Sequence, residues 1–322
     1  MTFTPKIELH LHLEGGAPPD LIRSMAAEKG LDLSDLFDAN GDYAFDDFAG
    51  FLATYEMATQ VFREPEDFER LTRAVLERSA AHGVIYTEMF LSPDFCGGRD
   101  LGAWRDYLAA IEAGAGQLPE IEMRGVVTAV RHLGPDAAVE AARCAAETAG
   151  TFVTGFGLAG NETVLRPHDF VRAFDMARDA GLGLTAHAGE FGGPDSVRAV
   201  IEDLKVARIG HGVRAIEDPA LVDRLAAEGV VLEVNPGSNV ALGVYENIAT
   251  HPIETLRERG VKVTVSTDDP PFFHTDMTAE YVALTDAFAW TDATFREINR
   301  TAAEAAFCDA TTRKTLFDRL EA

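Results

Sequence analysis

Two histidines separated by a single residue stand near the start of the chain, where residues 8–14 read ELHLHLE. Side chains alternate between the two faces of a β-strand, so His10 and His12 point the same way and the leucines around them point the other way. Two imidazoles one pleat apart can bind the same metal ion. His-x-His alone is a common accident, but the pair is a candidate for half of a metal site.

Three later segments carry polar residues of a similar kind. Residues 185–190 read TAHAGE and hold His187 and Glu190, and residues 208–212 read RIGHG and hold His211. Residues 266–270 read STDDP and hold Asp268 and Asp269. Taken singly, each has a structural explanation, because a strand histidine is commonly a hydrogen-bonded core residue and paired aspartates before a proline often cap a helix or form a turn.

The fold must bring these four segments together, and the sequence predicts one that does so. Eight β-rich runs alternate with longer stretches of helical spacing, many of which end in glycine. The β-rich runs are residues 7–13, 84–92, 121–131, 152–160, 182–190, 207–212, 230–236 and 262–269. Such alternation implies parallel strands joined by right-handed crossovers, and eight units in one domain-length chain favour a (β/α)8 TIM-type barrel over an open sheet.

In a barrel of this kind, the chemistry lies at the carboxyl ends of the strands. The four polar segments end the first, fifth, sixth and eighth predicted strands, so we expect them to meet at one rim. Three imidazoles and a carboxylate gathered there match a Zn²⁺ ligand shell that leaves room for water. We expect a single domain over residues 1–322, with a helical insertion at about 31–64 and a C-terminal helical tail at about 278–322.

The composition excludes several other classes of protein. The chain has 322 residues, with 28 Lys and Arg against 53 Asp and Glu, and a formal net charge of −25. Such a surface repels phosphate backbones and anionic lipids, so we expect neither a nucleic-acid nor a membrane partner. Three widely spaced cysteines provide no disulfide framework, and we find no signal peptide and no membrane span, which predicts a cytoplasmic protein. Nothing in the sequence indicates an oligomeric state.

In their order and approximate spacing, these motifs resemble the adenosine deaminase family of metal-dependent amidohydrolases along nearly the whole chain. The resemblance implies that His10, His12, His187 and Asp268 bind one Zn²⁺ per chain. Relatives in the wider amidohydrolase class that hold two metals bridge them with a carboxylated lysine from the fourth strand. This chain has no lysine between Lys29 and Lys205, so we expect a single ion.

The resemblance also implies roles for residues beside the metal. Glu190 would carry a proton to and from purine N1, and Asp269 would share one at purine N7. The backbone N–H of Gly160 would meet purine N3, and Glu14 would contact the substrate sugar. His211 would orient the metal-bound water, either as a base or as an electrostatic stabiliser, and the sequence leaves both roles open.

This chemistry predicts hydrolytic deamination of a 6-aminopurine. Water has a pKa of about 15.7, and a zinc ion lowers that of bound water to roughly 7, which supplies a hydroxide to attack purine C6. At the position of Glu14, adenosine deaminases usually have an aspartate, whereas a glutamate is common in relatives that act on free adenine. However, residues 271–274 (PFFH) and 15–19 (GGAPP) do not resemble the sequences that those relatives have at the corresponding positions. We therefore expect adenosine and deoxyadenosine as substrates, yielding inosine or deoxyinosine and ammonia.

Other functions stay open at this point. Adenine, which would give hypoxanthine, is the main alternative substrate, and another 6-aminopurine is a further one. More remote are a non-catalytic barrel that binds a purine or a metal, and an amidohydrolase acting on a non-purine amine or amide. The remaining histidines His82, His132, His168 and His251 are interpreted as surface or capping residues, and His274 as a possible pocket residue.

Overall fold

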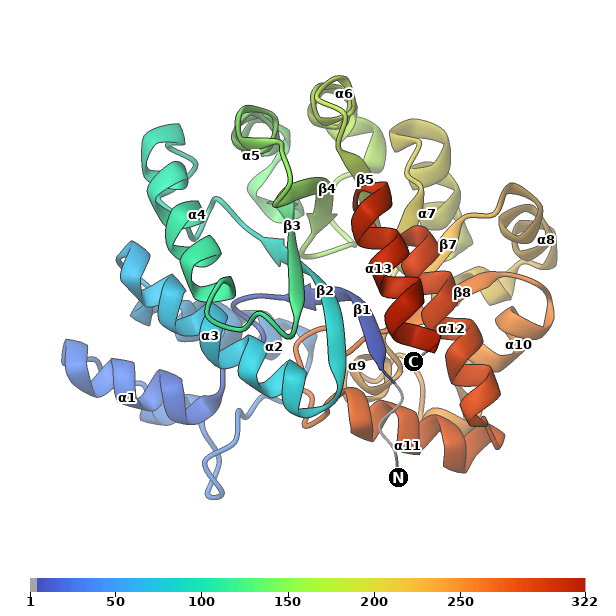
Figure 1. Ribbon diagram of the computed structural model, residues 1–322, viewed down its shortest axis with the longest axis horizontal. Coiled ribbons are helices and arrows are strands. Elements are labelled where there is room, and N and C mark those ends of the chain that lie inside the picture. Colours follow the sequence, from blue (N-terminus) through green and yellow to red (C-terminus); the bar gives the residue numbers. More distant parts are fainter. Residues whose placement is uncertain (1–4, 322) are drawn as a thin grey trace.

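Eight parallel strands form the centre of the molecule in the computed structural model, which describes residues 5–321. Each strand pairs with the next along the chain, so their order in the sheet is β1 to β8 (Figure 1). The strands are β1 (Lys6–His12), β2 (Val84–Leu91), β3 (Glu122–Val130), β4 (Val153–Ala159), β5 (Gly183–Ala188), β6 (Arg208–His211), β7 (Val231–Val234) and β8 (Lys262–Val265). The predicted (β/α)8 barrel is confirmed.

The barrel closes beside the predicted metal site. Leu11 of β1 pairs in parallel with Asp268, which lies just beyond β8. The backbone N–H of His12 donates to the Asp268 carbonyl at 3.0 Å, and the N–H of Asp268 donates to the His10 carbonyl at 3.1 Å. The first and last strands are thus joined at the residues that carry the candidate ligands.

Helices surround the strands and explain why the strands are apolar. All eight residues of β2 are buried, as expected for a strand with the barrel interior on one face and helices on the other. The helices that follow β2 to β7 are α4 (Leu101–Ala115), α5 (Pro135–Thr148), α6 (Val171–Asp179), α7 (Pro194–Ala199), α8 (Pro219–Glu228), α9 (Pro236–Ala241) and α10 (Ile253–Glu258). Four of them begin with proline, whose missing N–H costs nothing in a first turn.

The long connection from β1 to β2 carries three α-helices. They are α1 (Pro19–Lys29), α2 (Phe48–Ala58) and α3 (Pro65–Ala81). Of the residues expected to form a helical insertion, 31–64, the structure places 48–58 in α2, with short 3-10 turns at Ser34–Leu36 and Thr59–Val61. Phe51 of α2 packs against Phe273, with ring centroids 5.0 Å apart, so α2 lies over the carboxyl end of the barrel.

The C-terminal segment forms α11 (Met277–Phe288), α12 (Asp292–Ala305) and α13 (Ala310–Glu321), and α12 packs against β8 and β1 (Figure 1). The link between α12 and α13 closes the amino end of the barrel, where a Cβ on Gly183 would overlap the ring of Phe307. This link therefore lies opposite the candidate site. Within residues 5–321, no helix combines the length and the apolar character needed to cross a membrane.

Candidate active site

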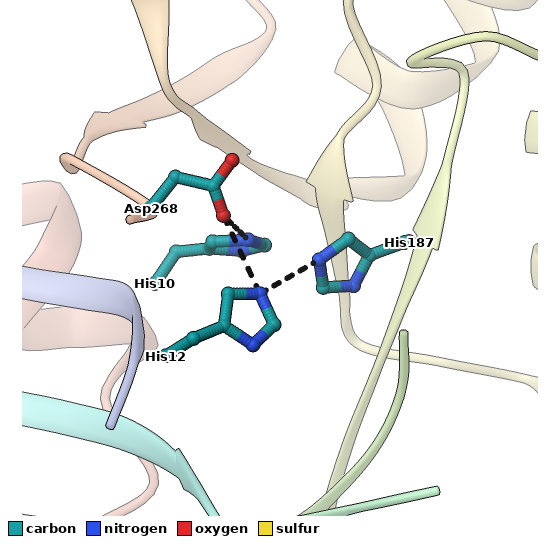
Figure 2. A group of neighbouring side chains, drawn as sticks. All are labelled: His10, His12, His187 and Asp268. Carbon is teal, nitrogen blue, oxygen red and sulfur yellow. Dashed lines mark hydrogen bonds and ion pairs between the residues drawn. The ribbon is translucent and has the colours of Figure 1, made fainter. Parts of the chain in front are cut away.

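The four predicted metal ligands converge at the carboxyl rim of the barrel (Figure 2). His12 Nε2 lies 3.3 Å from His187 Nε2 and 3.4 Å from Asp268 Oδ1. His10 Nε2 lies 3.2 Å from the same Asp268 oxygen. One ligand atom from each residue falls within 4.8 Å of all the others, so a single ion can contact all four.

Local backbone geometry brings these side chains together. His10 and His12 share a face because they are one pleat apart in β1. Asp268 has a φ of +68° and His211 a φ of +63°, a left-handed conformation that is unfavourable outside glycine and is typical of functional sites. A Cβ on Gly210 would lie 2.7 Å from His10 Cε1, so only glycine admits the imidazole there.

The donor atoms suit a cation. His187 Nδ1 faces the Leu158 carbonyl at 3.0 Å, so it carries the ring proton and Nε2 presents a lone pair to the cluster. Among the described residues, His10 Nε2 and Asp268 Oδ1 are buried and have no hydrogen-bond partner. Burial lowers the pKa values of His12 and His187, which keeps both rings neutral as metal binding requires. Converging lone pairs of this kind fit a divalent metal ion.

His10 differs from the other two imidazoles because carboxylates lie on both sides of it. Burial lowers its pKa, but the neighbouring carboxylates of Asp268 and Glu233 outweigh burial and raise the pKa to about 9. A positive charge between these carboxylates is thus strongly favoured, either as a proton on His10 or as a cation in front of it.

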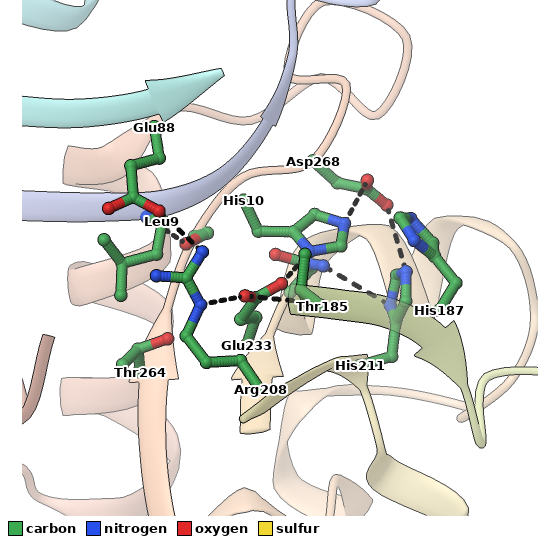
Figure 3. A network of polar contacts seen from close by, with 12 residues as sticks. Leu9, His10, Glu88, Thr185, His187, Arg208, His211, Glu233, Thr264 and Asp268 are labelled. Carbon is green, nitrogen blue, oxygen red and sulfur yellow. Dashed lines mark hydrogen bonds and ion pairs between the residues drawn. The ribbon is translucent and has the colours of Figure 1, made fainter. Parts of the chain in front are cut away.

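Behind His10, a buried network runs through the barrel interior (Figure 3). Glu233 of β7 accepts from His10 Nδ1 at 2.9 Å and from Arg208 Nε at 2.6 Å. Arg208 also donates to Glu88 at 2.6 Å and to the Ala305 carbonyl at 3.0 Å. The ring orientation of His10 is therefore tied to the C-terminal tail at the far end of the barrel.

Glu190 and His211 lie on the pocket side of the cluster. His211 Nε2 is 3.7 Å from Glu190 Oε2 and 3.8 Å from Asp268 Oδ2. Burial, with the charge of Asp268 next, raises the pKa of Glu190 well above its ordinary value, and the same two causes raise that of Asp269. Burial lowers the pKa of His211 to about 4. Two carboxyl groups with raised pKa values thus lie in the same pocket as a neutral imidazole, an arrangement suited to donating protons.

The backbone around Glu190 is held by Glu162, to which sequence reasoning assigned no role. The Glu162 carboxylate accepts from the N–H groups of Gly189, Glu190, Phe191 and Gly192 at 2.6 to 3.0 Å. It also accepts from the Ser196 hydroxyl at 2.5 Å. Burial raises its pKa, but these hydrogen bonds lower it overall, so the carboxylate stays ionised. Such a nest of N–H groups fixes the loop that carries Glu190.

A pocket opens in front of the cluster and holds the remaining predicted residues. Glu14, Gly160 and Asp269 all line it, and Gly160 has a φ of +90°. Tyr55 of α2 donates to Glu14 Oε2 at 3.3 Å, whereas Glu14 Oε1 is buried and lacks a partner within residues 5–321. Burial raises the pKa of Glu14 to about 7. The apolar lining includes Phe48, Phe51, Leu52, Phe90, Phe95, Val130, Ala159 and Leu242.

Several supporting residues escaped sequence reasoning. Ser238 donates to Asp268 Oδ2 at 2.6 Å, and Asn239 contacts His211 Nδ1 at 3.1 Å. His251 is not a surface residue, because its exposed fraction is 3% and it bonds to Asn239, but it does accept from the N–H of Ile253 at the start of α10. Only the clustering of asparagine, serine and proline after β7, at Asn235 to Asn239, hinted at a polar role there.

Comparisons with known proteins agree with this geometry. The family model described as adenosine deaminase matches residues 5–322. Adenine deaminases of Rhizobium leguminosarum bv. trifolii and Agrobacterium fabrum are each 48% identical, covering 98% of this chain and 98% and 97% of their own. The crystal structure of adenine deaminase from Arthrobacter aurescens has a TM-score of 0.90 at 30% identity, covering 99% of this chain and 98% of its own. An amidohydrolase of Burkholderia ambifaria with bound Zn has a TM-score of 0.82 at 26% identity, covering 98% of this chain and 92% of its own.

These relatives correct the predicted substrate. The expectation of adenosine and deoxyadenosine is wrong, because the full-length relatives at 48% identity are adenine deaminases. The misleading signal was the segment 271–274. Phe272 stacks on Tyr43 with ring centroids 3.8 Å apart, and Phe273 packs on Phe51. These rings therefore contribute to the packing beneath α2 and do not indicate which substrate the enzyme binds. The chain belongs to the metal-dependent adenosine deaminase family and is an enzyme of the purine aminohydrolase type.

Proposed function

We propose that the protein hydrolyses free adenine to hypoxanthine and ammonia. One feature of the pocket carries this choice of substrate, namely the buried Glu14 Oε1 that lacks a partner among the described residues. A buried acceptor without a donor is costly, so the natural ligand is expected to supply an N–H at this point. The names of the relatives at 48% identity support the same substrate.

Free adenine has the required donor and adenosine lacks it. In adenine, one nitrogen of the five-membered ring carries a hydrogen, whereas in adenosine that nitrogen is bonded to ribose. Glu14 is 3% exposed, and Tyr55 occupies its other oxygen, so the carboxylate is held in one orientation. A site that depends on one N–H typically rejects an analogue without it by several orders of magnitude.

We further propose that His10, His12, His187 and Asp268 hold one Zn²⁺. The converging lone pairs and the neutral state of His12 and His187 support this assignment. A divalent cation in that position supplies Lewis-acid chemistry, because it lowers the pKa of a bound water to roughly 7. β4 contains no lysine, which supports a single ion.

The protein groups then manage the protons of the reaction. Glu190, whose pKa is raised well above its ordinary value by burial, donates a proton to purine N1 as water adds to C6, and Asp269 shares a proton at N7. One proton of the water then returns to Glu190 and the other goes to the departing amino group, which leaves as ammonia, so the atoms balance. The apolar side chains of the pocket exclude bulk water from the ring. A net charge of −25 disfavours nucleic acids and anionic membranes as partners and is compatible with a small purine.

The test is a direct assay of the Zn²⁺-loaded protein. Ultraviolet difference spectra and ammonia release are measured with adenine, adenosine and deoxyadenosine. We expect kcat/KM for adenine to exceed that for either nucleoside by at least about 10²-fold. Glu190→Gln should keep stoichiometric zinc and lose at least about 10²-fold in kcat, whereas the exposed Glu202→Gln should match wild type. Equal turnover of adenine and adenosine would refute the proposed substrate.

A further inference from the structure

A chain of buried hydrogen bonds reaches His211 from the side opposite the pocket. It begins at a backbone N–H group, which can only be a donor. The backbone N–H of Ile253, the first residue of α10, donates to His251 Nδ1 at 3.2 Å. A backbone N–H can only donate, so His251 Nδ1 presents a lone pair and the ring proton lies on Nε2. Burial also lowers the pKa of His251 to about 3, which agrees with a neutral ring.

The next step fixes the orientation of Asn239 in α9. His251 Nε2 lies 3.1 Å from Asn239 Oδ1, and since this nitrogen is a donor, the amide oxygen must face it. The amide nitrogen of Asn239 then points the other way, toward His211 Nδ1 at 3.1 Å. The amide nitrogen of Asn235 lies 3.4 Å from the same atom. His251, Asn239, Asn235 and His211 are all no more than 3% exposed.

Two amide donors facing Nδ1 determine where the proton of His211 sits. An amide nitrogen has no acceptor capacity, so His211 Nδ1 must be an acceptor and its single ring proton must lie on Nε2. The reverse arrangement would require Asn239 to flip, which would set its nitrogen against His251 Nε2–H. His251 cannot adapt, because the N–H of Ile253 already occupies its Nδ1.

We propose that His251 and Asn239 are positioning residues that hold His211 with its proton on Nε2, so that His211 acts on the reacting water as a hydrogen-bond donor. His211 then orients and polarises the water and does not remove its proton. The proton passes instead to Glu190, which is ionised once it has protonated N1 and whose Oε2 lies 3.7 Å from His211 Nε2. The role in catalysis rests on the proposed function, whereas the position of the proton does not.

Asn239→Asp tests the proposal with almost no change in shape. One carboxylate oxygen can still accept from His251 Nε2, but the other must now accept from His211 Nδ1, which moves the proton to Nδ1. Nitrogen-15 spectra of histidine-labelled, Zn²⁺-loaded protein distinguish protonated from unprotonated ring nitrogens, and His211→Asn assigns the signals. We expect Nε2–H in the wild type and Nδ1–H in Asn239→Asp. We expect kcat for adenine to fall by about 10²-fold or more, with zinc content unchanged.

Two further variants separate this role from a general loss of stability. His251→Gln places an amide donor near the position of Nε2 and should keep kcat within about threefold, whereas His251→Leu should lose about tenfold or more. Asn299→Asp is the matched control. Asn299 is fully buried and contacts Tyr281, Phe295 and Ile7, so its replacement should lower the melting temperature but leave kcat within about twofold.

The results separate this proposal from the proposed function. If the wild-type protein deaminates no purine, the proposed function fails, but the spectra still locate the proton of His211. A wild-type spectrum with Nδ1 protonated would overturn the proposal. So would an Asn239→Asp variant whose proton has moved to Nδ1 while kcat stays within threefold of wild type.

Discussion

Replacing Glu233 by glutamine is expected to weaken zinc binding by about 10- to 100-fold, or about 1.4 to 2.7 kcal/mol. Glu233 accepts from His10 at 2.9 Å and from Arg208 at 2.6 Å, one with each carboxylate oxygen. Glutamine has a single acceptor oxygen, so one of the two bonds is lost and an amide N–H faces another donor. His10 then becomes a weaker electron donor and loses its fixed orientation, which lowers its affinity for a cation.

The same change also reaches the barrel interior. Burial raises the pKa of Glu233, but Arg208 and the bond from His10 lower it overall, so wild-type Glu233 is ionised. Without that charge, Arg208 keeps only Glu88 as an anionic partner at 2.6 Å. Breaking a buried ion pair costs about 3–5 kcal/mol, and the bond that glutamine retains places the expected loss at the lower end, about 3 kcal/mol.

The assay is competition for Zn²⁺ against a chromophoric chelator, with unfolding by denaturant measured in parallel. Thr185→Val is the matched control, because Thr185 donates to the Glu233 oxygen that faces Arg208, at 3.0 Å, and does not touch His10. It should change zinc affinity by less than about threefold. If Glu233→Gln binds zinc within twofold of wild type, the inference that Glu233 tunes His10 is refuted.

Three further predictions follow from the described contacts. Burial raises the folded-state pKa of Glu280 to about 7 from an ordinary 4.5, so its neutral form favours folding below pH 4.5 and this contribution is lost as the pH rises to about 7. The stability of Glu280→Gln relative to wild type should therefore rise by about 3 kcal/mol over that interval, and parallel pH curves of melting temperature would contradict this. Glu162→Gln should loosen the loop at Glu190, seen as faster amide exchange at residues 189–192 and about a tenfold lower kcat; unchanged exchange would exclude the role. Glu14→Asp withdraws the carboxylate by about 1.5 Å, and should lower kcat/KM for adenine about tenfold and shift preference toward adenosine, while a constant ratio would argue against the contact.

The candidate site was predictable to the extent that it depends on local pattern. His10 and His12 share a face because of the two-residue period of β1, and His187, His211 and Asp268 each lie near the end of a recognisable β-rich run. Parallel strands joined by crossovers place their carboxyl ends at one rim, so the residues that end them had to meet. The barrel and the cluster follow from these two facts.

The supporting residues were not predictable in this way. Glu233 lies 223 residues from His10, and Glu162 lies 28 residues from Glu190, with no periodicity that links them. The substrate was misjudged for a related reason, since residues 271–274 were weighed as a recognition sequence when Phe272 and Phe273 belong to the packing under α2.

The sequence by itself determined the order of strands, the ligand types and the reaction class, because each depends on residue identity and short-range spacing. Only the tertiary structure decided which groups face His211 Nδ1, which carboxyl groups have raised pKa values, and that Glu14 Oε1 has no partner among the described residues. These properties depend on burial and on hydrogen-bond partners from distant segments, and such partners exist only once the chain has folded.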